Sequence, residues 1–186
     1  MPKKEGDEEI LGKIQKNKPM VDAICITGGE PTMQRDLVDF IRKVKNLGFL
    51  VKLDTNGSNP DKIQTLIDEG LVDYFAMDIK APWEKYALIS PALNPKIVEE
   101  CKKTLAIIQD SGVPHEFRTT VFPGAHEDTD FFEMAGYLKE GEVYYIQEIS
   151  YFRNLDHSIP HDNTYDVCDV VHDLRLRFPA LSINTR

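Results

Sequence analysis

The sequence is poor in cysteine, with three in 186 residues, at positions 25, 101 and 168. An odd, widely spaced set argues against a disulfide framework and favours a reducing compartment. No apolar run approaches the roughly 20 residues of a membrane-spanning helix. The polar start Met1–Asp7 also lacks the apolar core of a signal peptide. We therefore expect a cytoplasmic protein without a membrane partner.

Positive charge is also scarce, because the 22 lysines and arginines are outnumbered by 31 acidic residues and the formal net charge is −9. This balance argues against nucleic acid or an anionic membrane surface as the main partner. The remaining composition, 41% hydrophobic and 28% charged, is that of an ordinary globular protein. Without a linker, low-complexity tract or repeat to divide it, the chain is expected to form one domain over residues 1–186.

Short apolar segments alternate with helical patterns along the chain. The segments are nearly continuous in hydrophobicity, which predicts strands covered on both faces: Val21–Thr27, Phe49–Asp54, Tyr74–Ile79, His115–Val121 and Val143–Ile149. Apolar spacing and Gly, Asn or Pro signals predict helices between them: Asp36–Leu47, Asp61–Glu69, Lys96–Ser111, Asp128–Lys139 and Thr164–Arg177. A weaker helix, Glu8–Gln15, leads the chain, and Ala180–Asn184 is a short final strand.

Repeated β-α units predict an α/β fold with a parallel sheet of five or six strands. The residues alone leave two architectures open, an open doubly wound sheet or a partial barrel. In both, ligands bind at the carboxyl ends of the strands.

The first strand ends in a glycine pair followed by a glutamate. Gly28 and Gly29 allow the backbone to approach a ligand closely, and the Glu30 carboxylate suits an ammonium group. A tight βα turn is the alternative. The second strand ends in Asp54, Thr55 and Asn56, short polar residues suited to a cation or to hydroxyls; an Asx turn is equally consistent.

Three later strands also deliver polar groups. Asp78 and Lys80 are two apart and would share one side of a strand, as ligand groups or as a structural ion pair. Arg118 can hold a carboxylate with two hydrogen bonds if it faces inward. Of Gln147 and Glu148, only one can face in. Together these groups suit a ligand that carries ammonium, carboxylate and ribose.

The motifs Ile26–Pro31, Leu53–Gly57 and Met77–Lys80, in this order at strand ends, resemble the radical S-adenosylmethionine (SAM) superfamily. More narrowly, they are similar to the activating enzymes of pyruvate formate-lyase and of anaerobic ribonucleotide reductase. The likeness is strongest over Ile24–Trp83. It implies a partial (β/α) TIM-like barrel of five to six mostly parallel strands.

The resemblance also implies roles for residues. Those that would surround SAM are Gly28, Gly29, Glu30, Asp54, Thr55, Asn56, Asp78, Lys80, Arg118 and Gln147. Among them, Asp54, Thr55 and Asp78 match positions around a monovalent cation beside the SAM carboxylate. Phe152 stands where the family has a histidine.

The chain departs from the family at its start. The family holds a [4Fe-4S] cluster on three cysteines spaced C-x3-C-x2-C, and no such motif precedes Val21 here. Cys25 would lie in a buried strand, and Cys101 and Cys168 would be core thiols on apolar helix faces. The first strand of the family is also missing, so the chain is expected to be a truncated form, the product of a mis-assigned start or a natural remnant. The exposed edge beside Val21–Thr27 would need cover from Glu8–Gln15 or a second chain.

The expected function is the core of a radical SAM activating enzyme, inactive as this chain alone. The complete enzyme would cleave SAM to generate a glycyl radical on a partner lyase or reductase, with electrons from a donor. One alternative is a catalytically dead SAM-binding or interaction module. Another is an unrelated barrel enzyme that uses Asp54, Asp78 and Lys80. A metal loop at Asp156–Asp162 is disfavoured, because Pro160 prevents a helical histidine pair.

Overall fold

The structure, a computed structural model, describes residues 6–86, 95–122, 124–149 and 166–186, and its centre is one parallel sheet. The strands are β1 (Ala23–Ile26), β2 (Leu50–Thr55), β3 (Tyr74–Asp78), β4 (His115–Thr120), β5 (Val143–Gln147) and β6 (Ser182–Thr185). They lie side by side in chain order, each parallel to the next. A doubly wound sheet reverses its strand order at a switch point. The uninterrupted order therefore identifies a partial barrel.

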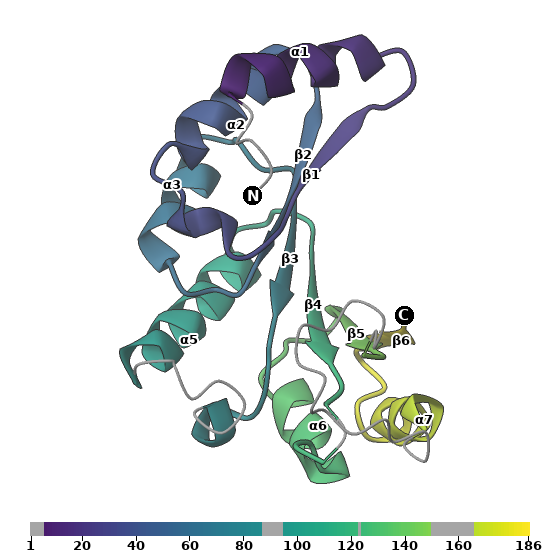
Figure 1. The fold of residues 1–186 in the computed structure, drawn as a ribbon. Helices are drawn as coiled ribbons and strands as arrows, with labels where there is room; N and C mark the ends of the chain where they lie inside the picture. Colours follow the sequence, from purple (N-terminus) through teal and green to yellow (C-terminus); the bar gives the residue numbers. More distant parts are fainter. Residues whose placement is uncertain (1–5, 87–94, 123, 150–165) are drawn as a thin grey trace.

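The helices cover the outside of this curved sheet. They are α1 (Asp7–Asn17), α2 (Leu37–Asn46), α3 (Pro60–Asp68), α5 (Pro95–Asp110), α6 (Asp128–Ala135) and α7 (Val167–Arg177), with short 3-10 turns η1 (Pro31–Met33) and η2 (Trp83–Lys85). Figure 1 shows α2, α3, α5, α6 and α7 following one another along one side of the sheet. Within the residues described, no helix has the length and apolar character needed to cross a membrane.

The hydrophobic core lies between the sheet and these helices. Val51 and Leu53 of β2, Phe75 of β3 and Phe117 of β4 point into it and are almost fully buried. They meet apolar helix residues such as Ile63 of α3, also fully buried. Burial of this apolar surface is the main force that holds the helical layer on the sheet.

The opposite face of the sheet, called the inner face below, is polar, so the expectation of strands covered on both sides is wrong. Lys52 and Asp54 alternate with the buried residues of β2, and Glu116 and Arg118 occupy the same face of β4. The apolar residues are concentrated on the helix side, and the charges on the inner face neutralise one another. Pairing of that kind is what makes charged strand residues tolerable.

The predicted segments overlap each strand and α-helix in the described part of the chain, with shifts at their ends. The helix predicted to Lys139 stops at Ala135, because Gly136, a poor helix former, occupies its C-cap. At α3, the Asn59 side chain accepts a hydrogen bond from Lys62 N (3.3 Å), the N-cap that the sequence indicates.

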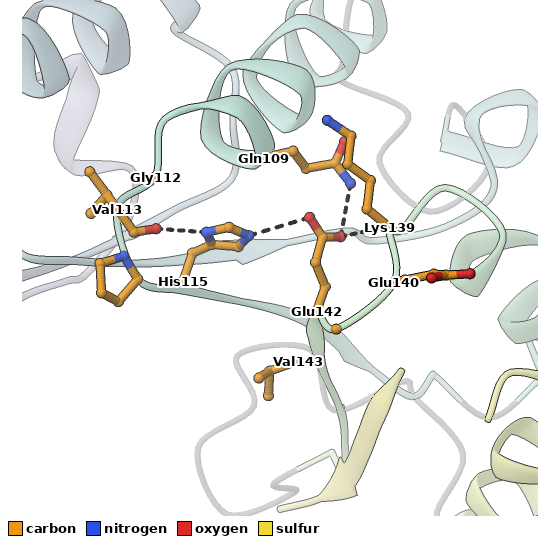
Figure 2. A pocket seen from close by; sticks show the side chains of 10 residues that line it. Gln109, Gly112, Val113, His115, Lys139, Glu140, Glu142 and Val143 are labelled. Carbon is orange, nitrogen blue, oxygen red and sulfur yellow. Dashed lines mark hydrogen bonds and ion pairs between the residues drawn. The ribbon is translucent and has the colours of Figure 1, made fainter. Parts of the chain in front are cut away.

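A polar cluster joins the amino ends of β4 and β5 (Figure 2). The His115 ring lies between the Val113 carbonyl (Nδ1···O 2.7 Å) and the Glu142 carboxylate (Nε2···Oε1 3.4 Å). Glu142 also accepts hydrogen bonds from Gln109 Nε2 (2.9 Å) and Lys139 N (2.8 Å). These residues line a hollow of about 410 Å³ at the end of the sheet opposite the predicted site.

Candidate functional site

The glycine pair after β1 forms an exposed turn. Gly28 has φ +98° and Gly29 has φ +51°, and residues that carry a Cβ rarely adopt these positive φ angles. A Cβ at either position would meet nothing within 4 Å. The glycines are therefore required by the backbone conformation, and the space beside them is open to a ligand.

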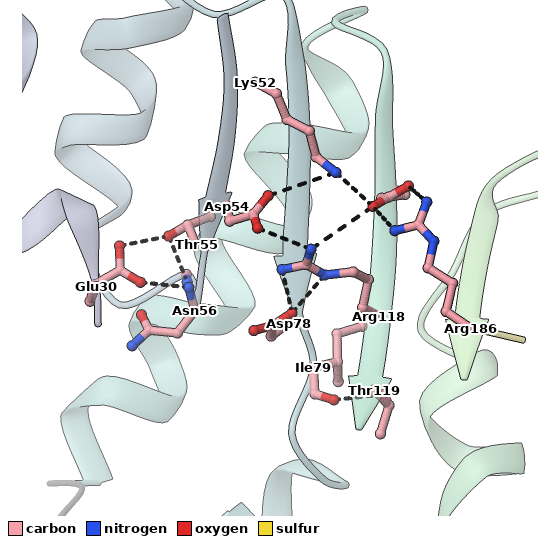
Figure 3. A network of polar contacts seen from close by, with 12 residues as sticks. Glu30, Lys52, Asp54, Thr55, Asn56, Asp78, Ile79, Arg118, Thr119 and Arg186 are labelled. Atoms are coloured by element: carbon pink, nitrogen blue, oxygen red, sulfur yellow. Dashed lines mark hydrogen bonds and ion pairs between the residues drawn. The ribbon is translucent and has the colours of Figure 1, made fainter. Parts of the chain in front are cut away.

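The Glu30 carboxylate fastens this turn to the end of β2. Its Oε1 accepts hydrogen bonds from Thr32 N (3.0 Å), Thr32 Oγ1 (2.6 Å) and Thr55 Oγ1 (2.9 Å), and its Oε2 accepts one from Asn56 N (2.6 Å). Figure 3 shows Glu30 reaching across to Thr55 and Asn56. Glu30 therefore aligns two strand ends, a structural role that the sequence motif alone did not indicate.

Arg118 bridges two aspartates on the inner face (Figure 3). Its Nε and Nη2 each lie 2.8 Å from Asp78 Oδ1, and its Nη1 lies 3.2 Å from Asp54 Oδ2. Asp78 and Arg118 are directly opposite in the β3–β4 register. The predicted inward arginine is thus present, and it joins groups from three neighbouring strands.

A second cluster lies on the same face around Glu116, whose side chain is 2% exposed. Its carboxylate accepts two hydrogen bonds from Arg186 (2.8 and 2.9 Å), one from Lys52 Nζ (3.1 Å) and one from Tyr74 Oη (3.1 Å). Lys52 Nζ also approaches Asp54 Oδ1 at 3.8 Å. This contact links the second cluster to the Arg118 bridge.

Electrostatics in the two clusters favour the ionised forms. Burial disfavours the charged forms of Glu116 and Arg118, but the attraction of the oppositely charged partners is stronger than this effect of burial. Arg186 and Lys52 lower the pKa of Glu116, and the aspartates raise the pKa of Arg118. Burial, followed by the nearby Glu116 charge, raises the pKa of Tyr74 to about 12. The inner face therefore carries a fixed set of charges at neutral pH.

The remaining predicted residues are only partly brought together. Thr55 is 3% exposed and points to the helix side, away from Asp54, because adjacent strand residues face opposite sides. Lys80 lies beyond the end of β3 and is exposed, so the partner of Asp78 is Arg118 rather than Lys80. Gln147 lies half-buried at the end of β5.

The cysteines do not gather. Cys25 is exposed on the edge strand β1, which contradicts its expected burial, and its Sγ lies 3.8 Å from Asp54 Oδ1. Cys168 is also exposed, since α7 buries Val167, Val170, Val171 and Leu174 instead. Cys101 is buried as predicted.

In the described parts of the chain no three His, Cys, Asp or Glu side chains are placed to hold a metal ion. Phe152 and the loop 156–162 lie outside the described residues.

Several inner-face residues did not emerge from the sequence. Lys52 precedes Asp54 by two positions and Glu116 precedes Arg118 by two, so strand periodicity could have placed each pair on one face. Arg186 reaches Glu116 from 70 positions away, and no local signal predicts that contact. His126, which follows β4, is 6% exposed and bonded to two strand-end segments, and no pattern in the sequence predicts those bonds.

Solved structures of other proteins share this fold. Streptococcus suis SuiB bound to S-adenosylmethionine superposes with a TM-score of 0.69 at 14% identity, covering 98% of this chain and 42% of SuiB. A domain of pyruvate-formate lyase-activating enzyme from Bacteroides vulgatus gives a TM-score of 0.61 at 13% identity, covering 87% of this chain and 98% of that domain. At such identities the likeness shows the fold alone.

Sequence comparison identifies the family as well as the fold. A candidate glycyl-radical enzyme activating enzyme of Methanocaldococcus jannaschii is 36% identical over 151 residues, which is 76% of this chain and 59% of that protein. The chain thus spans about three fifths of the length of this relative. The sequence profile of the Radical SAM superfamily matches residues 2–135, and with the partial barrel and its strand-end motifs this shows that the chain belongs to the radical SAM superfamily.

Proposed function

We propose that this chain is the SAM-binding core of an activating enzyme that generates a glycyl radical on a partner lyase or reductase, using electrons from a separate donor. The relative from M. jannaschii, 36% identical, supports the class of partner. The observation that carries the binding role is the Asp54–Arg118–Asp78 bridge, which lies on the inner face at the ends of β2, β3 and β4.

The residues present fit SAM chemically. The turn at Gly28 and Gly29 leaves open space in which backbone carbonyls can accept from an ammonium group. Arg118 has five N–H donors, and its bonds to the two aspartates leave donors for a carboxylate. The aspartates offer acceptors for hydroxyl groups. Ammonium, carboxylate and ribose hydroxyls are the groups that SAM presents together.

The residues do not fit an iron–sulfur cluster. The sequence has three cysteines, and they lie on an edge strand, in the core and on α7. We therefore propose that this chain alone does not cleave SAM, and that cleavage requires cluster ligands from outside this sequence.

Calorimetric titration with SAM tests the binding role. We expect the wild-type chain to bind, and Arg118→Gln to weaken binding about 10-fold to 100-fold, the effect of losing a hydrogen bond to a charged group. Arg42→Gln is the matched control, because Arg42 forms only exposed ion pairs on the helix side. An absence of heat with the wild-type chain, or equal affinity in Arg118→Gln, would contradict the proposal.

Iron and sulfide analysis after anaerobic reconstitution tests the claim of inactivity. We expect no stoichiometric cluster and no 5′-deoxyadenosine from SAM. A cluster together with SAM cleavage would show that the chain is active by itself. SAM binding without any stimulation of a glycyl-radical enzyme, even when the cluster segment of a relative is supplied, would instead favour a SAM-binding module without catalysis.

A further inference from the structure

His126 ties together the segments that follow β3 and β4. Its Nε2 donates a hydrogen bond to the Lys80 carbonyl (2.8 Å), and its Nδ1 accepts one from Phe122 N (3.0 Å). A backbone N–H can only donate and a carbonyl can only accept, so the two partners fix a neutral ring with its hydrogen on Nε2. Burial of the ring, which is 6% exposed, keeps both bonds away from water.

These two segments form the walls of a small cleft at the candidate site. The cleft, of about 50 Å³, is lined by Asp78, Ile79, Lys80, Thr120 and Phe122. The residues that His126 joins therefore lie on its two sides. Asp78 is also the aspartate that Arg118 holds, so the cleft adjoins the bridge on the inner face.

The peptide groups around Lys80 are held at both ends. The Lys80 N–H donates to Tyr86 Oη (3.1 Å), while its carbonyl accepts from His126. On the other side, Phe122 O accepts from His126 N (3.0 Å), so Phe122 is bonded to both the ring and the backbone of His126. Loss of the ring contacts would free the Lys80 carbonyl and the Phe122 N–H together.

The charged groups that face the ring come from α6 and η2. Asp130 of α6 favours the protonated ring and Lys85 of η2 opposes it, and these two residues pair with each other at 2.7 Å. Phe131 packs its ring edgewise against His126 with centroids 5.2 Å apart. Burial is the largest influence and lowers the pKa of His126 below its usual 6.5, which keeps the ring neutral near pH 7.

We propose that His126 is a positioning residue for the candidate SAM site: its neutral ring holds the segments after β3 and β4 in register, and protonation of Nδ1 breaks the bond to Phe122 and uncouples them. A protonated Nδ1 carries a hydrogen and can no longer accept from Phe122. The relevance to ligand binding rests on the proposed function, whereas the coupling of the two segments does not.

Hydrogen exchange measured by mass spectrometry over about pH 5 to about pH 8 tests the coupling. After correction for intrinsic exchange, we expect the peptides covering 79–86 and 121–127 to lose protection together as the pH falls, while β2 keeps its protection. In His126→Asn, whose amide oxygen can accept from Phe122 without titrating, this pH dependence should disappear. His172→Gln, an exposed histidine on α7, should behave like the wild type.

A response of only one segment, no response, or the same response in His126→Asn would overturn the proposal. The wild-type series needs no variant, so a poorly folded substitution does not prevent the test.

SAM affinity measured across the same pH range should weaken about fivefold on protonation, which corresponds to the free energy of one hydrogen bond, and should not change in His126→Asn. A coupled opening with unchanged affinity would refute the positioning role. A lack of SAM binding at any pH would refute the proposed function and leave the exchange result to judge the coupling.

Discussion

At the scale of single residues, Glu30 shows how one carboxylate can hold the ends of two strands together. All four of its hydrogen bonds go to protein groups, two at Thr32 and one each at Thr55 and Asn56. Two of the donors are backbone N–H groups, whose positions depend on the strand ends that they close. The ionised side chain is therefore needed as an acceptor on both oxygens.

Replacing Glu30 by glutamine removes this double acceptor. The amide NH2 would face either the Asn56 N–H or the donors of Thr32 and Thr55, so one side becomes a donor–donor contact. We expect Glu30→Gln to lower the free energy of unfolding by about 1–3 kcal/mol, measured by urea denaturation. Glu8→Gln on the exposed face of α1 is the control, and equal stability of the two variants would refute the role given to Glu30.

At the scale of elements, the end of β2 is set by the turn at Gly57. Its φ of +78° is strained for any residue with a side chain, and an added Cβ would collide with Met77 Cε. Gly57 also donates its N–H to Thr55 Oγ1 (3.1 Å), and its carbonyl accepts from Thr104 Oγ1 (2.7 Å). The turn thus connects β2, β3 and α5.

Gly57→Ala should destabilise the protein by more than about 1 kcal/mol, because the native φ is unfavourable for alanine. Gly12→Ala in α1, where a Cβ meets nothing within 4 Å, should stabilise it by about 0.5–1 kcal/mol. Thermal unfolding of both variants checks the opposite signs. A neutral Gly57→Ala would mean that the turn relaxes into another conformation.

At the scale of the whole molecule, polar clusters join strands that are distant in the chain. Glu116 connects β2, β3 and β4 with Arg186 after β6, and the His115–Glu142 pair joins the amino ends of β4 and β5. The His115–Glu142 pair depends on pH. A hydrogen bond to Glu142 raises the pKa of His115 against the opposing effect of burial. Burial opposes ionisation of Glu142, but its bonds to His115 and Gln109 lower its pKa overall.

The His115–Glu142 pair should stabilise the fold most between about pH 4.5 and pH 6.5. The Glu142 contribution is present above its unfolded pKa of 4.5 and is lost as the pH falls through the lower folded value. The His115 contribution is complete below its unfolded pKa of 6.5 and is lost as the pH rises through the higher folded value. The stability difference between wild type and His115→Gln, measured by urea unfolding, should therefore shrink at alkaline pH. A difference that grows there would contradict the pairing.

Much of the candidate site can be predicted from local sequence, and the remaining contacts depend on how the strands align with one another. Strand ends at Gly28, Asp54 and Asp78 are predictable because glycines and short polar residues follow apolar runs. Burial of Cys25 and Cys168 was wrongly predicted, since apolar neighbours do not reveal that β1 lies at an edge or which face α7 buries. Periodicity places Arg118 on a face but does not name the residues across from it.

The sequence by itself determined the order of β-α units and the strand-end motifs, because periodicity, capping and turn preferences act over a few neighbouring residues. The residue patterns left a doubly wound sheet and a partial barrel open, and the family resemblance implied the barrel. The tertiary structure confirmed the barrel, because the strand order does not reverse. It also decided the partners: Arg118 meets Asp78 from 40 positions away, and His126 meets Lys80 from 46. Such contacts depend on how whole strands align, and no local pattern encodes that alignment.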